Sequence, residues 1–361
     1  MTDLFTPTAI GSLALPNRVV MAPMTRARSS ADGVQGPMNA EYYSQRASAG
    51  LIITESTMVS ASSVGGVNQP GLMNDAQVEG WRGVTQAVHD AGGRIFAQLW
   101  HCGRVTHSTL LGGAHPIAPS ALPAAGAIFT PAGRQPYETP RALEPDEITA
   151  ILADFARAAE YAEDAGFDGV ELHGAFGYLP DQFLQSSSNQ RTDQWGGSLE
   201  NRMRFVLAAI DAMVDVWGAT RVGIKLSPSN RVNGMHDAHA ADTFGALVQQ
   251  LDRRSLGYIH LTEPSPADLE TGTVEIEHVA RLFRPMVRGA LITNGGYDKA
   301  RASAALAEGL ADLVSFGAPY VANPDLVERL RNDPVPLNTP DKATFYGGGA
   351  RGYVDYPALK T

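Results

Sequence analysis

Residues 145–172 read PDEITAILADFARAAEYAEDAGFDGVEL, a helix-forming stretch followed at once by a short strand-forming one. Pro145 suits the first position of a helix, and Gly166 suits its end. The apolar run at 169–172 is typical of a parallel strand that is buried on both faces. Apolar side chains recur in the helical part at spacings of three and four, on one helix face: Ile148, Leu152, Phe155, Ala159 and Ala162.

The same unit recurs along the chain. Eight runs favour buried strands: Arg18–Ala22, Leu51–Thr54, Arg94–Leu99, Gly169–Leu172, Val222–Leu226, Tyr258–Leu261, Ala290–Thr293 and Leu313–Phe316. Further helical patterns lie between them: Asp75–Ala91, Leu199–Val216, Asp242–Arg253, Lys299–Glu308 and Pro324–Arg331. Eightfold alternation of strand and helix predicts an α/β fold, a single (β/α)8 TIM barrel. A doubly wound sheet is the alternative, but no glycine-rich phosphate motif follows the first strand.

One connection is unusually long. Residues 102–142 separate the third strand from its helix and hold six prolines with several glycines. A loop of this length inside a compact domain is usually functional. We therefore expect it to cap the C-terminal face of the barrel, where barrel active sites are built. Without a linker or an internal repeat, residues 1–361 are predicted to form one domain.

Composition excludes several classes of protein. The 361 residues carry 28 Lys and Arg against 38 Asp and Glu, a net charge of −10, which disfavours binding to nucleic acid or to anionic membranes. The single cysteine, Cys102, rules out an internal disulfide, an iron–sulfur cluster and a cysteine-rich zinc site. No apolar run reaches membrane-span length, and the N-terminus lacks signal-peptide features, so a cytoplasmic location is expected. Composition leaves the choice between monomer and homo-oligomer open.

The C-terminal ends of the predicted strands carry a distinctive set of side chains. Paired carboxylates and a G-x-S-x-G nucleophile motif are missing from it. Glycine turns follow strands seven and eight, where barrels often bind phosphate through backbone N–H groups. These ends predict a phosphorylated ligand whose polar ring is bonded by Gln, Thr and Lys, beside a His/Tyr pair. The set comprises Pro23, Met24, Thr25, Glu55, Ser56, Gln98, Trp100, His101, His173, Tyr178, Lys225, Thr262, Glu263, Asn294, Gly295, Gly296 and Gly317.

Each of these residues also has an ordinary structural interpretation. Taken alone, His173 is more often a satisfied interior histidine than a catalytic one, and Tyr178 could be a core aromatic. Lys225 is harder to dismiss, because a charge inside a buried strand needs a partner.

Three further signals are weak. Gly347, Gly349 and Gly352 match a dinucleotide-binding spacing without a strand–helix unit around them. His236 and His239 lack an obvious third metal ligand, so no metal is expected. Cys102 is expected to pack rather than react.

Several long motifs, in order, resemble those of the Old Yellow Enzyme family of FMN-dependent, N-ethylmaleimide reductase-like ene-reductases. The resemblance covers nearly the whole chain. It rests on these segments: LPNRVVMAPMTR at 15–26, YYSQRASAGLIITE at 42–55, QLWHCGR at 98–104, NQRTDQWGGSLENR at 189–202, ANPDL at 322–326 and GYVDYP at 352–357.

The resemblance implies a two-step hydride relay. NADPH or NADH would reduce FMN, and flavin N5 would then pass hydride to the β-carbon of an activated alkene, with Tyr178 as proton donor. His173 would bond the carbonyl or nitro oxygen of the substrate, and Trp100, with Tyr346, would shape its pocket. The cofactor would be held by Pro23, Met24, Thr25, Ser56, Gln98 and Lys225 around the ring and by Gly295, Gly296, Gly317 and Ala318 at the phosphate.

The sequence departs from the family pattern at three positions, one of them, Phe176, in the substrate pocket. Phe176 stands where the family usually has a second His or an Asn that donates to the substrate oxygen, and losing one such donor typically costs about 3 kcal/mol. Lys225 stands where an Arg is usual, which keeps the charge but loses the planar fork. Ala318 replaces a frequent phosphate-binding Arg, so FMN is expected to bind less tightly.

Alternative functions stay open at this point. A nitrate-ester or nitroaromatic reductase would use the same flavin scaffold, and Phe176 favours it more than usual. A barrel hydrolase without flavin could use Glu171 or Glu263 as its acid. A flavin-binding ligand sensor with decayed catalysis is a third alternative.

Overall fold

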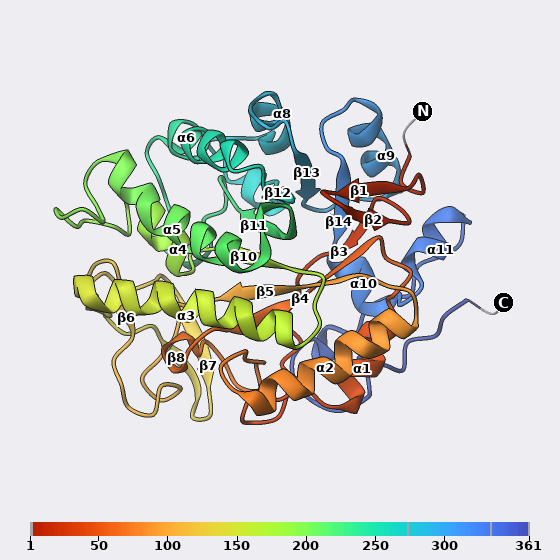
Figure 1. The fold of residues 1–361 in the computed structure, drawn as a ribbon, viewed down its shortest axis with the longest axis horizontal. Coiled ribbons are helices and arrows are strands. Elements are labelled where there is room, and N and C mark those ends of the chain that lie inside the picture. Colours follow the sequence, from red (N-terminus) through yellow and green to blue (C-terminus); the bar gives the residue numbers. More distant parts are fainter. Residues whose placement is uncertain (1–2, 273, 333, 360–361) are drawn as a thin grey trace.

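Eight parallel strands close into a barrel in this computed structural model, which describes residues 3–272, 274–332 and 334–359 (Figure 1). Met1 and Thr2 of the N-terminal segment considered above lie outside those ranges. Around the barrel the strands are β3 (Val19–Met21), β4 (Leu51–Met58), β5 (Ile95–Trp100), β10 (Gly169–Gly174), β11 (Val222–Leu226), β12 (Tyr258–Thr262), β13 (Ala290–Asn294) and β14 (Leu313–Phe316). The predicted (β/α)8 barrel is therefore confirmed.

Strand β4 differs most from its prediction. It runs eight residues to Met58, and its register with β5 shifts between Ile53 and Ser56. A bulge of this kind re-aims side chains next to active sites. Glu55 and Ser56, expected just beyond the strand, consequently lie inside it.

Helices surround the barrel in Figure 1. The longer ones are α1 (Pro37–Ser44), α2 (Asp75–Asp90), α3 (Pro145–Asp164), α5 (Leu199–Trp217), α6 (Ala240–Arg253) and α9 (Lys299–Ala307). The shorter ones are α4 (Leu179–Leu184), α7 (Pro266–Glu270), α8 (Val279–Phe283), α10 (Ala318–Ala322) and α11 (Leu326–Arg331). Helix α3 begins at Pro145 as expected, and the Asn74 and Ser198 side chains accept from backbone N–H groups to cap α2 and α5.

The long connection between β5 and α3 carries two small sheets. Strand β6 (Ile117–Ala118) pairs with β9 (Arg141–Ala142), and β7 (Ala127–Thr130) forms a hairpin with β8 (Gly133–Pro136). The connection contacts loops that follow other barrel strands: Thr106 donates to the carbonyl of Val64, and the Ala125 amide donates to that of Asn233. It therefore lies against the loops at the C-terminal ends of β4 and β11.

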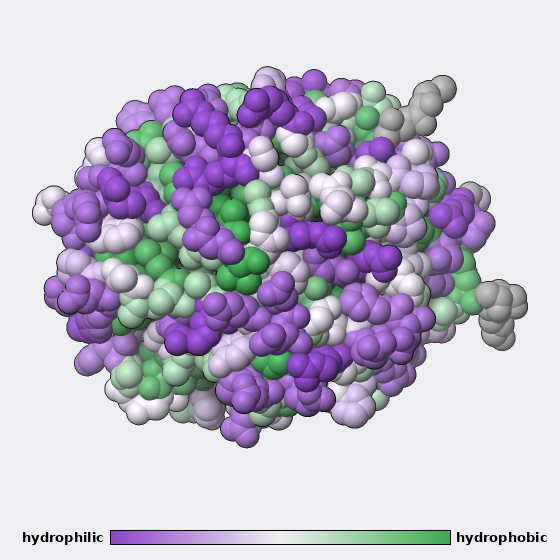
Figure 2. Space-filling view, in the orientation of Figure 1, coloured by the Kyte–Doolittle hydropathy of each residue, from purple (hydrophilic) through white to green (hydrophobic). Residues whose placement is uncertain are grey.

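The opposite end of the barrel is sealed by apolar packing. The hairpin of β1 (Thr8–Ile10) and β2 (Leu13–Leu15) packs on buried inward residues that include Phe96 and Tyr258. On the outer surface, hydrophobic side chains form scattered patches among hydrophilic ones (Figure 2). No helix in the described ranges is long and apolar enough to cross a membrane.

Candidate active site

A continuous chain of hydrogen bonds crosses the upper interior of the barrel. The Ser56 hydroxyl donates to Gln98 Oε1 over 3.1 Å, and Gln98 Nε2 donates to Glu171 Oε1 over 2.7 Å. The second oxygen of Glu171 lies 2.9 Å from His260 Nδ1, and His260 Nε2 lies 2.8 Å from Ser315 Oγ. These residues come from β4, β5, β10, β12 and β14, so side chains of five strands meet at one level.

The hydrogen-bond partners of His260 determine its tautomer. Glu171 as a carboxylate can only accept, so Nδ1 of His260 carries the proton and Nε2 accepts from Ser315. Burial lowers the pKa of His260, which keeps the ring neutral despite the neighbouring carboxylate. Asn294 completes the network by donating from Nδ2 to Ser315 Oγ over 2.8 Å.

Lys225 adds a buried positive charge beside this network. It lies one residue before the end of β11, is 3% exposed, and its Nζ lies 5.3 Å from the centre of the Phe176 ring. Burial lowers the pKa of Lys225 to about 8, although Glu171 acts in the opposite direction. A desolvated ammonium of this kind can stabilise a negative charge that develops on a bound ligand.

His173 and Tyr178 lie together at the end of β10. Their rings are 4.7 Å apart and meet edge to face at 80°, and the Trp100 ring lies 5.1 Å from Tyr178. Burial and the charge of Lys225 hold the pKa of His173 well below its usual range, so the imidazole is neutral. Within the described ranges His173 Nδ1 has no hydrogen-bond partner. The protein therefore leaves hydrogen-bonding capacity of this imidazole unused.

The loop after β3 brings the Pro23–Thr25 segment to the same end of the barrel. Glu55 holds the loop, because its Oε2 accepts from the backbone N–H groups of Arg26 and Ala27 at 3.0 and 3.1 Å. Met24 also approaches the turn after β14: a Cβ added to Gly317 would lie 3.7 Å from Met24 Sδ.

The two glycine turns expected to bind phosphate follow β13 and β14. Gly295 and Gly296 have φ of +130° and +63°, which glycine adopts without penalty. Gly317 precedes α10, whose first residue is Ala318. Ala318 brings no charge. The exposed Arg301, however, reaches the Gly295–Gly296 turn and donates to the carbonyl of Gly296 over 2.7 Å. A cation therefore lies at the glycine turn although the usual Arg is missing.

Two tyrosines outside the barrel strands lie near Tyr178. Tyr137, on the long connection, and Tyr346, in the C-terminal segment, both act electrostatically on the Tyr178 hydroxyl, whose pKa is raised mainly by burial. Tyr346 is 71% exposed. Its segment is held by Arg26, which donates to the carbonyls of Phe345 and Gly352.

The residues on which the hydrolase alternative depends are engaged elsewhere. Glu171 is fully buried within the network described above. Both oxygens of Glu263 accept backbone N–H groups of Val279 and Ala280 at the start of α8. Neither carboxyl group is left free to protonate a substrate.

The three weak signals also have structural roles. His236 pairs with Glu275 over 3.1 Å. Cys102 is buried, and burial raises the pKa of its thiol well above the usual value. Among the three glycines near the C-terminus, the amide of Gly352 donates to Asp355, and no helix follows in the described part of the chain.

Sequence reasoning missed several members of this site. His260 and Ser315 sit in strands that read as purely structural, and Tyr137 and Asn233 lie in long loops. The alternation of Tyr258 and His260 along one strand was a usable signal, because residues two apart face the same side. Nothing local in the sequence indicates that Tyr137 approaches Tyr178.

The geometry thus places a buried lysine, a neutral histidine and a tyrosine at one end of the barrel. The family model described as NADH:flavin oxidoreductase / NADH oxidase matches residues 3–335. The chain is 43% identical over 361 residues (99% of this chain, 94% of the relative) to putative 12-oxophytodienoate reductase 2 from Oryza sativa subsp. japonica. The chain belongs to the Old Yellow Enzyme family, and it is an NAD(P)H-dependent flavin oxidoreductase.

Solved structures agree. Morphinone reductase in complex with tetrahydroNAD matches with a TM-score of 0.94 at 48% identity, covering 100% of this chain and 98% of that one. The Old Yellow Enzyme homologue from Zymomonas mobilis matches with a TM-score of 0.95 at 41% identity, covering 99% and 100%.

Proposed function

We propose that this protein uses FMN and NADPH or NADH to reduce the activated C=C bond of small α,β-unsaturated carbonyl or nitro compounds. The observation that carries the proposal is the neutral His173 imidazole, with Nδ1 unpartnered, beside the Tyr178 ring at the polar end of the barrel. FMN, when bound, supplies the hydride. The residues of the chain bind, orient and protonate.

The residues at this end suit an FMN molecule. Gln98 can bond the edge of a polar ring, since its amide has hydrogen-bonding capacity beyond the bonds to Ser56 and Glu171. Lys225 would stabilise the added negative charge of the reduced ring. We propose that Pro23, Met24 and Thr25 line the ring, and that the turns at Gly295–Gly296 and Gly317–Ala318 take the phosphate.

Tyr178 and His173 would divide the work on the substrate. The raised pKa of Tyr178 keeps its hydroxyl protonated at neutral pH, so it can donate a proton to the α-carbon. His173, being neutral, can donate one hydrogen bond to the activating oxygen. Trp100 and Tyr346 would line the pocket. Residues 102–142 would cap it, as part of the same single domain. A cytoplasmic location stays a prediction.

Phe176 supports a second candidate. Its ring supplies no donor to a substrate oxygen, so an enone is held by one imidazole instead of two groups, at a cost of about 3 kcal/mol. A nitrate ester or nitroaromatic relies less on protonation at carbon, which keeps reduction of these compounds as the alternative activity of the same site.

The test compares substrate classes under steady turnover. NADPH and NADH oxidation is followed with FMN-loaded protein and 2-cyclohexenone, a nitroalkene, a nitroaromatic or a nitrate ester, and the organic product is identified. We expect cyclohexanone from the enone, and a loss of about 10²-fold or more in its formation on Tyr178→Phe. Products from nitroaromatics or nitrate esters alone would favour the second candidate. Failure of the protein to take up FMN would overturn the proposal.

A further inference from the structure

Two residues between His173 and Tyr178 hold a conformation that L-amino acids rarely adopt. Phe176 has φ of +58°, and Gly177 follows with φ of +78°. Glycine tolerates this region, but phenylalanine is strained there. Strain of this kind persists only where the surroundings impose it.

Side chains bond every backbone N–H and C=O group of this two-residue turn. The Phe176 N–H donates to Ser227 Oγ over 2.8 Å, and its carbonyl accepts from Asn233 Nδ2 over 2.8 Å. The Gly177 N–H donates to Asp181 Oδ2 over 2.9 Å, and its carbonyl accepts from Gln182 Nε2 over 2.7 Å. Two partners come from α4 and two from the loop between β11 and α6, so the turn is held from both sides.

Two members of this clamp also reach the long connection: Gln182 bonds its start at Cys102 and Arg104, and Asn233 bonds its later part. Asn233 Oδ1 accepts from the Tyr137 hydroxyl over 3.4 Å, and the Asn233 carbonyl accepts from the Ala125 amide over 3.2 Å. Asn233 itself has φ of +61°, a conformation that asparagine tolerates better than most residues. One side chain therefore bridges the connection at Tyr137 and the turn at Phe176.

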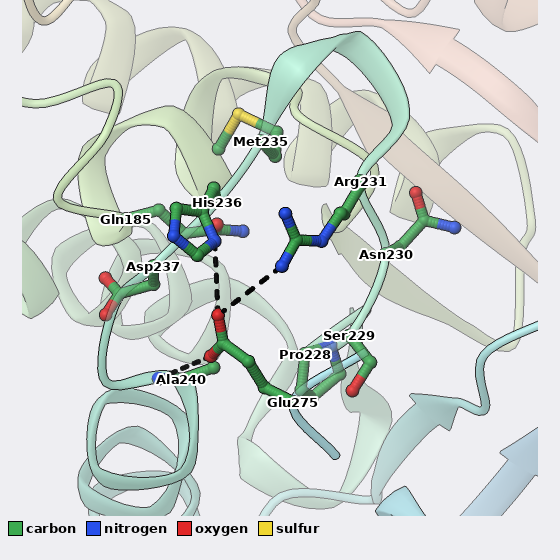
Figure 3. A pocket seen from close by; sticks show the side chains of 10 residues that line it. All are labelled: Gln185, Pro228, Ser229, Asn230, Arg231, Met235, His236, Asp237, Ala240 and Glu275. Atoms are coloured by element: carbon green, nitrogen blue, oxygen red, sulfur yellow. Dashed lines mark hydrogen bonds and ion pairs between the residues drawn. The ribbon is translucent and has the colours of Figure 1, made fainter. Parts of the chain in front are cut away.

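The loop that carries Asn233 is anchored on its outer side (Figure 3). Glu275 accepts there from the backbone N–H of Ala240 and pairs with His236 and Arg231, which the dashed lines mark. Asp237 pairs with Arg202 over 2.9 Å. The side chains that line the pocket in Figure 3 thus bind one another, and these interactions hold the loop that carries Asn233.

We infer that Asn233 is a positioning residue that holds the Phe176–Gly177 turn and thereby sets the orientation of Tyr178 relative to His173. This rests on the proposed function, in which these two rings act on the same substrate. Asn233 touches neither the substrate nor the flavin in this account. Its effect reaches the reaction through the turn alone.

The experiment uses full-length, FMN-loaded Asn233→Gly. Glycine keeps the positive φ, so this variant removes the side-chain bonds without adding backbone strain. Asn233→Asp is the second variant, since it keeps an acceptor for Tyr137 but loses the donor to Phe176. Asn230→Ala is the matched control: the same residue type in the same loop, whose side chain bonds only the Val232 N–H within the described residues.

Two readouts separate positioning from general damage. Photoreduced enzyme is mixed anaerobically with 2-cyclohexenone, and flavin reoxidation is timed in H2O and D2O. We expect both Asn233 variants to reoxidise at least tenfold more slowly, with a larger solvent isotope effect, and FMN affinity to stay within twofold. Hydrogen exchange of the 174–178 segment should rise in both variants and stay unchanged in Asn230→Ala.

Contradiction would be unambiguous. Wild-type-like reoxidation and unchanged exchange in both Asn233 variants would overturn the inference. If the wild-type enzyme itself does not reoxidise with the enone, the proposed function fails instead, while the exchange measurement still tests the clamp. If Asn233→Gly does not fold, Asn233→Asp carries the test.

Discussion

The two ends of the barrel interior differ, although the same strands build both. At the sealed end, the inward residues of β5 and β12 are Phe96 and Tyr258, whose rings lie 5.9 Å apart. Two residues further along the same strands stand Gln98 and His260, which belong to the buried hydrogen-bond chain. Since residues i and i+2 face the same side of a strand, one step of two residues changes the interior from packing to chemistry.

Glycines make the sealed end possible. A Cβ on Gly169 would lie 2.4 Å from the Phe96 ring, and one on Gly223 would lie 2.3 Å from the Tyr258 ring. At this level β10 and β11 therefore have glycines, which leave room for the large rings of β5 and β12. At the polar level the same two strands carry Glu171 and Lys225. The comparison shows that the side chains at one level of the barrel depend on their neighbours in adjacent strands, and not on the residues before and after them in the same strand.

The largest expected effect comes from breaking the polar layer at its centre. Glu171→Ala removes the acceptor of both Gln98 and His260 and the carboxylate that acts electrostatically on Lys225, which should cost about 3–5 kcal/mol of unfolding free energy. Urea denaturation of the FMN-free protein measures it. Glu308→Ala, which breaks an exposed pair with Arg281, should cost no more than about 1 kcal/mol. Equal losses would show that the layer is not energetically coupled.

The charge in the polar layer should carry a stability cost that depends on pH. Below pH 8, Lys225 is charged in both folded and unfolded chains, so burying it is unfavourable. Between about 8 and 10.5 the folded chain releases this proton first, and the cost fades as pH rises. Lys225→Met should therefore stabilise the FMN-free protein at pH 7 by up to about 3 kcal/mol, the free-energy equivalent of that pKa difference, with a smaller gain at pH 10.

The same substitution should weaken FMN binding, which fluorescence titration measures. Lys342→Met, at an exposed position, is the control and should change neither quantity. A Lys225→Met protein that is less stable at pH 7, or that gains stability more at pH 10, would contradict the account.

The sealed layer should respond to added volume alone. Gly223→Ala forces a methyl group against the Tyr258 ring and should destabilise by about 1–3 kcal/mol, with FMN affinity unchanged. Gly83→Ala in α2 has open space around its Cβ and should stabilise by up to about 1 kcal/mol. Thermal unfolding of both variants measures the contrast. It would fail if Gly223→Ala altered FMN binding as strongly as stability.

The smallest effect is expected at the rim. Arg301→Ala removes the cation at the Gly296 turn and should weaken FMN binding a few-fold, more at low salt than at high salt. Titration at two ionic strengths measures it, with Arg253→Ala, on α6, as a charge-matched control. An unchanged Kd at low salt would mean that backbone groups alone hold the phosphate.

Sequence reasoning reached the barrel because each strand is a local apolar run of the right length. It also placed His173, Tyr178, Lys225 and Gln98 at one end, since strand ends converge in this fold. It did not find Asn233, whose side chain meets Phe176 across 57 positions of sequence. Long-range bonds between loops leave no periodic trace, so only the structure reveals them.

The β4 bulge illustrates the same limit. In the sequence the apolar run ends at Thr54 because Glu55 and Ser56 are polar, yet both are buried beside partners from other segments, Tyr43 and Gln98. Burial of a polar residue depends on those partners, which the local sequence does not indicate.

The central claim is that the polar end of this barrel carries ene-reduction with one imidazole and one tyrosine. The most direct test is anaerobic: reduce the FMN-loaded protein with NADPH, add 2-cyclohexenone, and follow the oxidised flavin band. The account predicts prompt return of the band, lost by about 10²-fold or more in Tyr178→Phe. A reduced flavin that persists with the enone would contradict it.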